Sequence, residues 1–255
     1  MKLKFLGTGT SQGVPVIGCD CEVCRSEDVR DQRMRASVMF TTDEGKKILV
    51  DCGPDFRRQM LDFGESHVDA LLLTHEHNDH VIGLDDLRPI IFKTGQNIAV
   101  YGKARVCEEV RRRFPYAFAE ERYPGAPAFD LFALENQAVE IAGTMVLPIE
   151  VRHYQMEIYG YRFGAAAYVT DASFISQEEK EKLKNLDILV LNCIRKEKPH
   201  PAHFILPEVL ALNDELKPKK MYLTHISHHF GRYLEEENRL PSNVHQAYDG
   251  LELFF

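Results

Sequence analysis

Residues 74 to 80 carry the pattern H-x-H-x-D-H, made by His75, His77, Asp79 and His80. Side chains of an extended segment alternate, so His75 and His77 can face the same cation. A turn after His77 would direct Asp79 and His80 toward a second cation. Neutral imidazoles and carboxylates are common ligands of zinc-like ions. The motif therefore favours a two-metal hydrolytic site over a solvated surface loop.

The segments on either side of this motif predict how it is mounted. The mostly apolar run 68–73 is typical of a buried strand, which places the motif at a carboxyl end. After the motif, Val81, Leu84 and Leu87 recur at helical spacing, and Pro89 is expected to end that short helix. We therefore expect the ligands on a loop between a strand and a helix.

Three more metal-binding residue types follow predicted strands elsewhere in the chain. His153 follows the run 145–151, Asp171 follows 168–170, and His225 follows 222–224. A two-metal site needs another histidine for the first cation, a bridging carboxylate, and another histidine for the second. Each of these residues alone would be an ordinary polar residue at a strand end. Together with the motif, they are predicted to complete the site.

A cysteine cluster near the start of the chain predicts separate chemistry. Cys19, Cys21 and Cys24 have spacings that allow three thiolates to surround one tetrahedral cation, with a fourth ligand from elsewhere. A redox dithiol and free surface thiols are the alternatives. The remaining cysteines have apolar neighbours and are predicted to be small core residues: Cys52, Cys107 and Cys193.

Composition limits the class of protein. The chain has 255 residues, 44% of them hydrophobic, and a net charge of −8, so we expect one large domain spanning 1–255. The acidic balance disfavours a general nucleic-acid binder but does not exclude a local basic patch. The sequence shows neither a signal-peptide pattern nor an apolar run long enough for a membrane span, which predicts a cytoplasmic protein. A homodimer stays open.

The order of predicted elements indicates an α/β fold. Strands are expected at 3–6, 37–42, 48–51, 166–170, 188–191 and 221–223, and helices near 106–114, after Ser176 and after Pro207. This alternation predicts an αββα sandwich of two mixed sheets with helices outside and the site along one edge. The segment 115–132, rich in proline and aromatic residues, is expected to lack regular structure and to form a lid, a dimer contact or a packed loop.

Several motifs together resemble a known family. The H-x-H-x-D-H motif, the opening 5–9 (FLGTG), 50–53 (VDCG), His153, 170–173 (TDAS) and 223–225 (LTH) resemble the metallo-β-lactamase superfamily over nearly the whole chain. Within it, 18–24 (GCDCEVC) and 224–228 (THISH) look like the PhnP branch. Members of that branch are phosphodiesterases of phosphonate degradation that open a cyclic ribosyl phosphate.

The resemblance implies a specific set of ligands. One catalytic metal would be held by His75, His77 and His153, and the other by Asp79, His80 and His225, with Asp171 bridging the pair. The cofactors implied are two divalent catalytic ions, zinc or manganese, and one structural zinc held by Cys19, Cys21, Cys24 and His228. Asp51 resembles the buried aspartate of the family, which could orient a ligand histidine; a helix or turn cap is the alternative.

The same resemblance implies the mechanism. A metal-bridging hydroxide would attack the phosphodiester, so Asp79 and Asp171 count as catalytic residues as well as ligands. His203 is expected to protonate the leaving group, with a pKa near the unperturbed value of about 6.5. His200 is the competing proton donor, and a plain surface-loop role is the alternative for His203.

The expected substrate is a small phosphodiester, with a cyclic ribosyl phosphate as one candidate. Other members of the superfamily process tRNA 3′ ends or hydrolyse thioesters and lactones with similar ligands, so these activities stay open. A third class is a metal-dependent sensor or scaffold without turnover.

Overall fold

Short apolar runs form the strands of two β-sheets in the computed structural model, which describes residues 1–255. The first sheet has seven strands in the order β15-β1-β2-β3-β4-β5-β6. Its strands are β1 (Lys2–Gly7), β2 (Ser37–Thr41), β3 (Lys47–Val50), β4 (Ala70–Leu72), β5 (Ile98–Gly102), β6 (Phe129–Ala133) and β15 (Glu252–Phe254).

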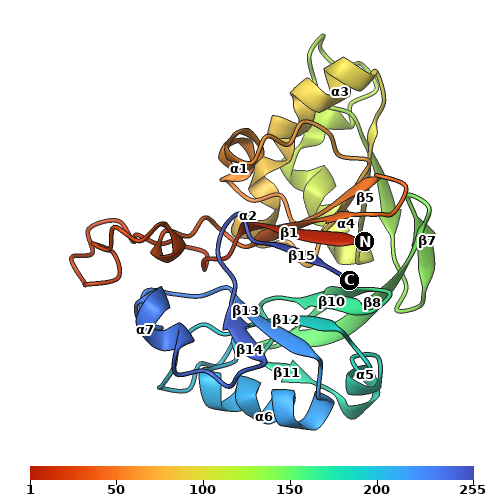
Figure 1. Cartoon of the computed structure of the whole chain (residues 1–255). Coiled ribbons are helices and arrows are strands. Elements are labelled where there is room, and N and C mark those ends of the chain that lie inside the picture. The colour runs from red at the N-terminus through yellow and green to blue at the C-terminus, as the bar shows by residue number, and fades with distance from the viewer.

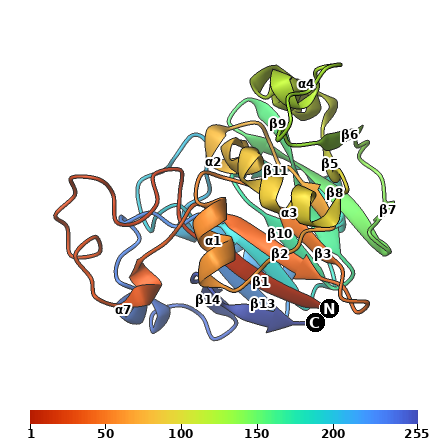
Figure 2. The same ribbon diagram turned by 90° about the horizontal axis from the view of Figure 1, so that it is seen from above.

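The second sheet has eight strands in the order β11-β8-β9-β10-β12-β13-β14, with β7 paired to β8. Its strands are β7 (Val139–Ile141), β8 (Thr144–His153), β9 (Met156–Phe163), β10 (Ala166–Val169), β11 (Phe174–Ile175), β12 (Ile188–Asn192), β13 (Lys220–Thr224) and β14 (Val244–Gln246). The two sheets lie face to face between outer helices (Figures 1 and 2), which confirms the predicted αββα sandwich.

The helices cover the outer faces of the sheets. They are α1 (Phe56–Asp62), α2 (Asn78–Val81), α3 (Arg88–Thr94), α4 (Ala104–Arg113), α5 (Gln177–Glu181), α6 (Leu206–Leu216) and α7 (Tyr233–Glu237), with 3₁₀ turns at Val29–Asp31, Ile82–Leu87 and Pro115–Ala117. In Figure 1, α1, α3 and α4 lie on one side of the paired sheets and α5, α6 and α7 on the other. None of these helices is long and apolar enough to cross a membrane.

Three hydrophobic layers hold the sandwich together. The middle layer joins the facing surfaces of the two sheets, where Phe40 stacks on Phe163 with ring centroids 3.8 Å apart. The outer layers pack each sheet against its own helices, through residues such as Phe56 on one side and Val209 on the other. Burial of this much apolar surface is the main source of stability for the strands whose ends carry the polar ligands.

Each sheet contains a parallel portion that points its carboxyl ends toward the same region. In the first sheet β3, β4, β5 and β6 are parallel neighbours, and in the second β10, β12, β13 and β14 are. Polar groups at the carboxyl ends of parallel strands meet at one edge of a sheet. This topology brings together residues that are far apart in the sequence.

Two sequence-based expectations about secondary structure were wrong. Pro89 lies in the first turn of α3 rather than ending a helix, because a proline there has no intrahelical N–H bond to lose. The segment 115–132 is not irregular throughout, since it starts with a 3₁₀ turn and ends in β6, which pairs in parallel with β5. Phe129, the first residue of β6, is buried in the core. The proline-rich stretch before it obscures this strand in the sequence.

Candidate metal centre and active site

The first predicted ligand group is assembled from a loop and a hairpin. Nitrogen atoms of His75, His77 and His153 all lie within 4.8 Å of one another. His75 Nε2 and His77 Nδ1 are 3.0 Å apart. His153 is the last residue of β8, and its Nδ1 lies 2.9 Å from the carbonyl oxygen of Ala202, so this ring nitrogen donates and Nε2 is left free to bind a cation.

The second group comprises Asp79, His80, Asp171 and His225, whose ligand atoms also lie within 4.8 Å of one another. Asp79 and His80 sit in α2, immediately after the loop that carries the first histidines. Asp171 follows β10 and His225 follows β13. Asp171 also groups with His153 and His203, so it lies between the two sets of ligands. That is the position expected of a bridging carboxylate.

Buried nitrogen atoms without hydrogen-bond partners show that these residues fit divalent cations. His80 Nε2 and His225 Nε2 are both buried and make no hydrogen bond. His80 Nε2 nevertheless lies 3.4 Å from Asp171 Oδ2, and His225 Nε2 lies 3.1 Å from Asp171 Oδ1. Unpaired buried nitrogens are costly unless something else coordinates them. Imidazoles and carboxylates converging in this way match the ligand preferences of zinc and manganese.

The backbone at three strand ends adopts an unusual conformation that aims the side chains into the site. Asp51, Asp171 and His225 have φ values of 65°, 58° and 53°, the left-handed region that non-glycine residues rarely occupy. Such strain persists only where the surroundings enforce it. Asn192 provides part of that restraint, since its side chain accepts a bond from Ala172 N at 2.7 Å and donates to Ala172 O at 2.9 Å. No local pattern in the sequence indicates this role of Asn192.

Asp51 holds His80, a member of the second ligand group, through a hydrogen bond to its carboxylate. Its carboxylate is fully buried and accepts hydrogen bonds from His80 Nδ1 at 2.7 Å, from Thr74 N at 2.9 Å and from Thr74 Oγ1 at 2.9 Å. A carboxylate on Nδ1 fixes the tautomer of the ring and leaves Nε2 to coordinate a metal. Asp51 therefore orients His80 rather than capping a helix or turn.

The electrostatics of the site favour neutral imidazole in one group and ionised carboxylates in the other. Burial, reinforced by nearby His80, lowers the pKa of His75 well below its ordinary value. Burial also opposes ionisation of Asp171, but His225 and His80 outweigh it and hold its pKa below the usual range. Deprotonated histidine and ionised aspartate are the forms that bind metal.

His203 lies in the site, but its protonation differs from the sequence-based expectation. The ring stacks on His225 with centroids 4.8 Å apart, and Nδ1 is 3.7 Å from Asp171 Oδ1. Burial, followed by the proximity of His225, lowers its pKa to about 3, so the expectation of an unperturbed value was wrong. His200 lies next to His203, with centroids 4.9 Å apart, and its pKa is also lowered by burial.

A cavity of 670 Å³ opens beside the first ligand group. Its lining consists of His77, Arg105, His153, Tyr154, Gln155, Met156, Glu157, Pro201 and Ala202. Residues 154–157 form the turn between β8 and β9 and the start of β9, and Pro201 and Ala202 immediately precede His203. The volume is in the range of small-molecule binding sites.

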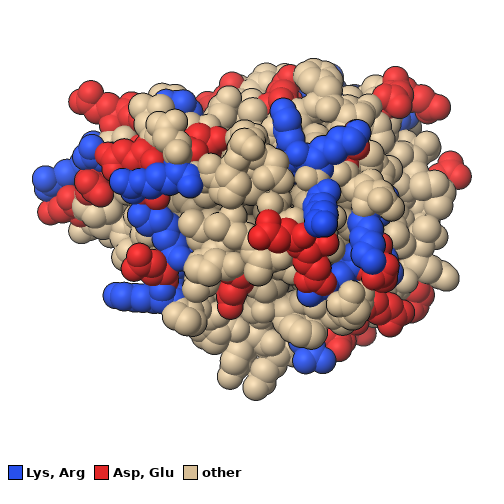
Figure 3. Space-filling view, turned by 60° about the horizontal axis from the view of Figure 1, so that its bottom comes forward, with Lys and Arg blue, Asp and Glu red and all other residues tan.

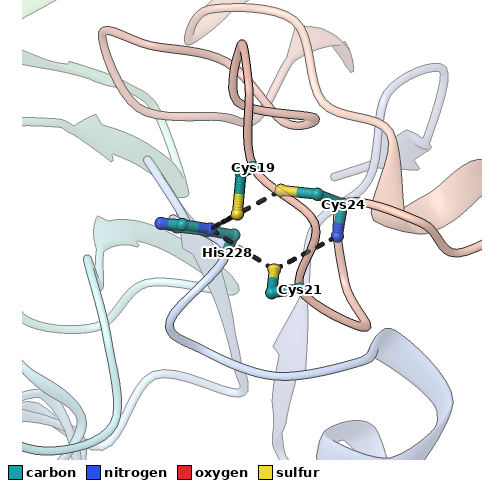
Figure 4. Close-up of side chains that lie close together, drawn as sticks. All are labelled: Cys19, Cys21, Cys24 and His228. Carbon is teal, nitrogen blue, oxygen red and sulfur yellow. Dashed lines mark hydrogen bonds between the residues drawn. The ribbon is translucent and has the colours of Figure 1, made fainter.

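The cysteine cluster lies around a histidine from the other end of the chain (Figure 4). The Sγ atoms of Cys19, Cys21 and Cys24 are 3.2, 3.4 and 3.5 Å from Nδ1 of His228. Three thiols around one imidazole nitrogen match the ligand set of a structural zinc site. The other three cysteines are buried core residues, as predicted: Cys52, Cys107 and Cys193.

The two sites are connected through one short loop. Ile226 and Ser227 separate His225 from His228. The backbone N–H of Ile226 donates to Thr8 O at 2.9 Å, and its carbonyl accepts from Thr10 N at 3.3 Å. The segment that leads into the cysteine loop therefore pairs with the loop that carries one catalytic-group histidine.

Comparison with known proteins agrees with this geometry. A family model described as the β-lactamase superfamily domain matches residues 46–226. The chain belongs to the metallo-β-lactamase superfamily. A crystal structure described as a new diphosphatase from the PhnP family is 42% identical, with a TM-score of 0.92 over 100% of this chain and 97% of that one. This match places the chain in the PhnP-like branch of the superfamily.

Two curated relatives are similar over part of their length. An octanoyltransferase of Porphyromonas gingivalis is 42% identical over 99% of this chain but only 51% of its own length. A ribonuclease Z of Bradyrhizobium diazoefficiens is 29% identical over 48% of this chain and 42% of its own. The alignments thus cover about half of the length of these two relatives, or less.

Proposed function

We propose that this chain is a dinuclear metal-dependent phosphodiesterase that acts on a small phosphodiester, with cyclic ribosyl phosphates among the candidates. The observation that carries the proposal is the position of Asp171 between two ligand groups, beside a cavity large enough for a small molecule. The similarity to a PhnP-family diphosphatase supports phosphoryl chemistry.

The proposed ligand sets follow the two groups. One metal would be held by His75, His77 and His153, and the other by Asp79, His80 and His225, with Asp171 shared. Two adjacent divalent cations, when bound, acidify water and neutralise charge on phosphoryl oxygens. Asp51 would keep His80 in the tautomer that the second cation needs, through the 2.7 Å bond to Nδ1.

The proposed proton donor is His203, at the junction of the two ligand groups. In the free site its low pKa keeps the ring neutral at pH 7. An anionic phosphodiester bound next to the ring would raise that pKa, because a nearby negative charge favours the imidazolium form. His203 could then give its proton to the departing alkoxide. His200 is more exposed than His203 and stays the competing donor.

Charge distribution argues against tRNA as the substrate. On the face shown in Figure 3, acidic side chains are interspersed among the basic ones, which does not match the clustered cations that bind a nucleic-acid backbone. The similarity to a ribonuclease Z keeps tRNA 3′ processing as an outcome to test.

Thioester hydrolysis is a second candidate because of one specific observation. The relative named octanoyltransferase is 42% identical to nearly all of this chain. Since the chain matches only 51% of that protein, the name can describe its other half. An octanoyl thioester is therefore a necessary comparison substrate.

A substrate panel tests the proposal. The protein, loaded with zinc or manganese, is assayed with bis(4-nitrophenyl) phosphate, a cyclic ribosyl phosphate, a tRNA precursor and an octanoyl thioester. We expect turnover of phosphodiesters that a chelator abolishes and added metal restores. Hydrolysis of the thioester or the tRNA precursor without turnover of the two small phosphodiesters would contradict the proposal, and metal binding with no turnover at all would indicate a sensor or scaffold.

A further inference from the structure

A threonine directly precedes a ligand residue at three strand ends, in the pairs Thr74 and His75, Thr170 and Asp171, and Thr224 and His225. All three threonines are completely buried, but their hydroxyl groups have different partners. The hydroxyl of Thr170 donates to Asp171 Oδ2 at 2.6 Å, whereas that of Thr224 makes no hydrogen bond. Only the hydroxyl of Thr74 contacts two side chains.

The Thr74 hydroxyl lies between a carboxylate and a ligand imidazole. Its Oγ1 is 2.9 Å from Asp51 Oδ2 and 3.0 Å from Nδ1 of His75. Asp51 Oδ2 also accepts from His80 Nδ1, at 2.7 Å. All four residues are completely buried, and hydrogen bonds are electrostatically stronger where water is excluded. A continuous chain of contacts therefore runs from His75 through Thr74 and Asp51 to His80.

The donors and acceptors in this chain follow from the chemistry of the groups. An ionised carboxylate can only accept, so the single hydroxyl proton of Thr74 points to Asp51. The lone pairs of Thr74 Oγ1 then face His75, and Nδ1 of His75 must carry the proton of that contact. This tautomer leaves Nε2 of His75 without a proton. Nε2 is the atom that converges with His77 Nδ1, at 3.0 Å, in the first ligand group.

We propose that Thr74 is a positioning residue that holds His75 in its metal-binding tautomer. Asp51 would then orient one ligand in each metal group, His80 directly and His75 through the Thr74 hydroxyl. This inference rests on the proposed two-metal function. Because a hydrogen-bond partner on the second ring nitrogen raises the affinity of a ligand histidine, the Thr74 hydroxyl should strengthen binding of the first metal more than that of the second.

Three variants test the proposal. Thr74→Val keeps the branched shape of the side chain and the backbone N–H that bonds Asp51, but it removes the hydroxyl. Thr74→Ser keeps the hydroxyl. The matched control is Thr224→Val, at a buried strand end where the hydroxyl has no partner. Zinc-loaded proteins are equilibrated with a chromophoric chelator, and crystals equilibrated at the same free zinc give the anomalous peak height at each ligand group.

We expect Thr74→Val to lower the zinc affinity of the first ligand group by about tenfold or more, the usual effect of losing such a partner. The second ligand group should lose less. Thr74→Ser should restore the first group to within about threefold of wild type, and Thr224→Val should bind zinc like wild type in both groups. In ¹⁵N-histidine spectra of the zinc-loaded wild type, the proton of His75 should be on Nδ1, and it should exchange faster in Thr74→Val.

Two results would overturn the proposal. One is a Thr74→Val protein whose first ligand group retains zinc as well as wild type does. The other is an equal loss of zinc in Thr74→Ser or in Thr224→Val, which would attribute the effect to packing at the strand ends. If zinc occupies both groups but no phosphodiester is turned over, the proposed function fails and the assignment of Thr74 stands. If the wild type binds no zinc at the strand ends, both fail.

Discussion

The strand-end ligands and the cysteine ligands are both predicted metal sites, but very different amounts of protein hold them in place. His75, His80 and Asp171 are almost completely buried. His75 and Asp171 follow strands β4 and β10 of the packed sheets, and His80 lies in α2 next to the core residue Val81. The cysteine loop has a satellite cluster of only three buried residues: Val14, Val23 and Cys24. In Figures 1 and 2 this part of the chain projects from the body of the sandwich beside α7.

The difference shows two ways to build a metal site. At the strand ends the fold already positions the ligands. Bound metals there would contribute to catalysis more than to the stability of the fold. At the cysteine loop a metal would supply the stability that the small core lacks, because binding energy at a structural zinc site is folding energy. Substitutions in the two regions should therefore affect different properties, turnover in one and stability in the other.

The largest effect is expected for Asp171→Asn, at the point shared by both ligand groups. Asparagine tolerates the left-handed backbone of residue 171 but lacks the negative charge of a bridging ligand. We expect kcat on bis(4-nitrophenyl) phosphate to fall at least roughly 10²- to 10³-fold, as for loss of one strong electrostatic group. An unchanged circular dichroism spectrum and retention of the metal at the cysteine site would show that the substitution affects only the strand-end site. Turnover close to wild type would contradict a bridging role.

His203→Ala should have the next largest effect, and its size should depend on the leaving group. With a poor alkoxide leaving group we expect a loss of roughly 10²- to 10⁴-fold, the usual range for a general acid. With 4-nitrophenolate, which departs without a proton, the loss should be much smaller. His200→Ala is the matched control and should change both rates little. If His200→Ala shows the leaving-group dependence instead, the proton donor is reassigned.

Asp51→Asn should weaken metal binding without removing a ligand. The amide can present its NH₂ to His80 Nδ1, which favours the wrong tautomer, so affinity for the second metal should drop by roughly 10- to 100-fold. Metal titration followed by calorimetry would measure this change. An unaltered affinity would mean that Asp51 serves the fold only, through its bonds to Thr74.

Cys21→Ser should produce the smallest loss of turnover and the clearest loss of stability. Removing one thiolate should release the structural metal and lower the melting temperature by roughly 5 °C or more. Turnover should fall by no more than about tenfold, through the loop that joins His228 to His225. Cys107→Ala, at a core thiol outside both sites, is the control for metal content. Full metal content and unchanged melting in Cys21→Ser would refute a structural zinc.

Local patterns in the sequence were enough to predict most of the site. The H-x-H-x-D-H motif is contiguous, and His153, Asp171 and His225 each follow an apolar run that forms a strand. The left-handed backbone of Asp171 and His225, and the support from Asn192, depend on how neighbouring strands meet and leave no local signal. Burial likewise decides the pKa of His203, which composition and spacing do not reveal.

Contacts between distant elements explain the remaining differences. Arg105 looks like one of several charged residues on the outer face of a helix, and only the packing of α4 beside β9 brings it to Glu157. Phe129 follows a proline-rich stretch, and its place in β6 is set by pairing with β5. In both cases the deciding partner lies tens of residues away in the sequence.

Anomalous diffraction from crystals grown with zinc, collected on both sides of the zinc edge, tests the central claim most directly. The predicted result is three anomalous peaks per chain: one among His75, His77 and His153, one among Asp79, His80 and His225, and one among the cysteines and His228. A peak at the cysteines alone, with none at the strand ends under saturating metal, would contradict a two-metal hydrolytic site.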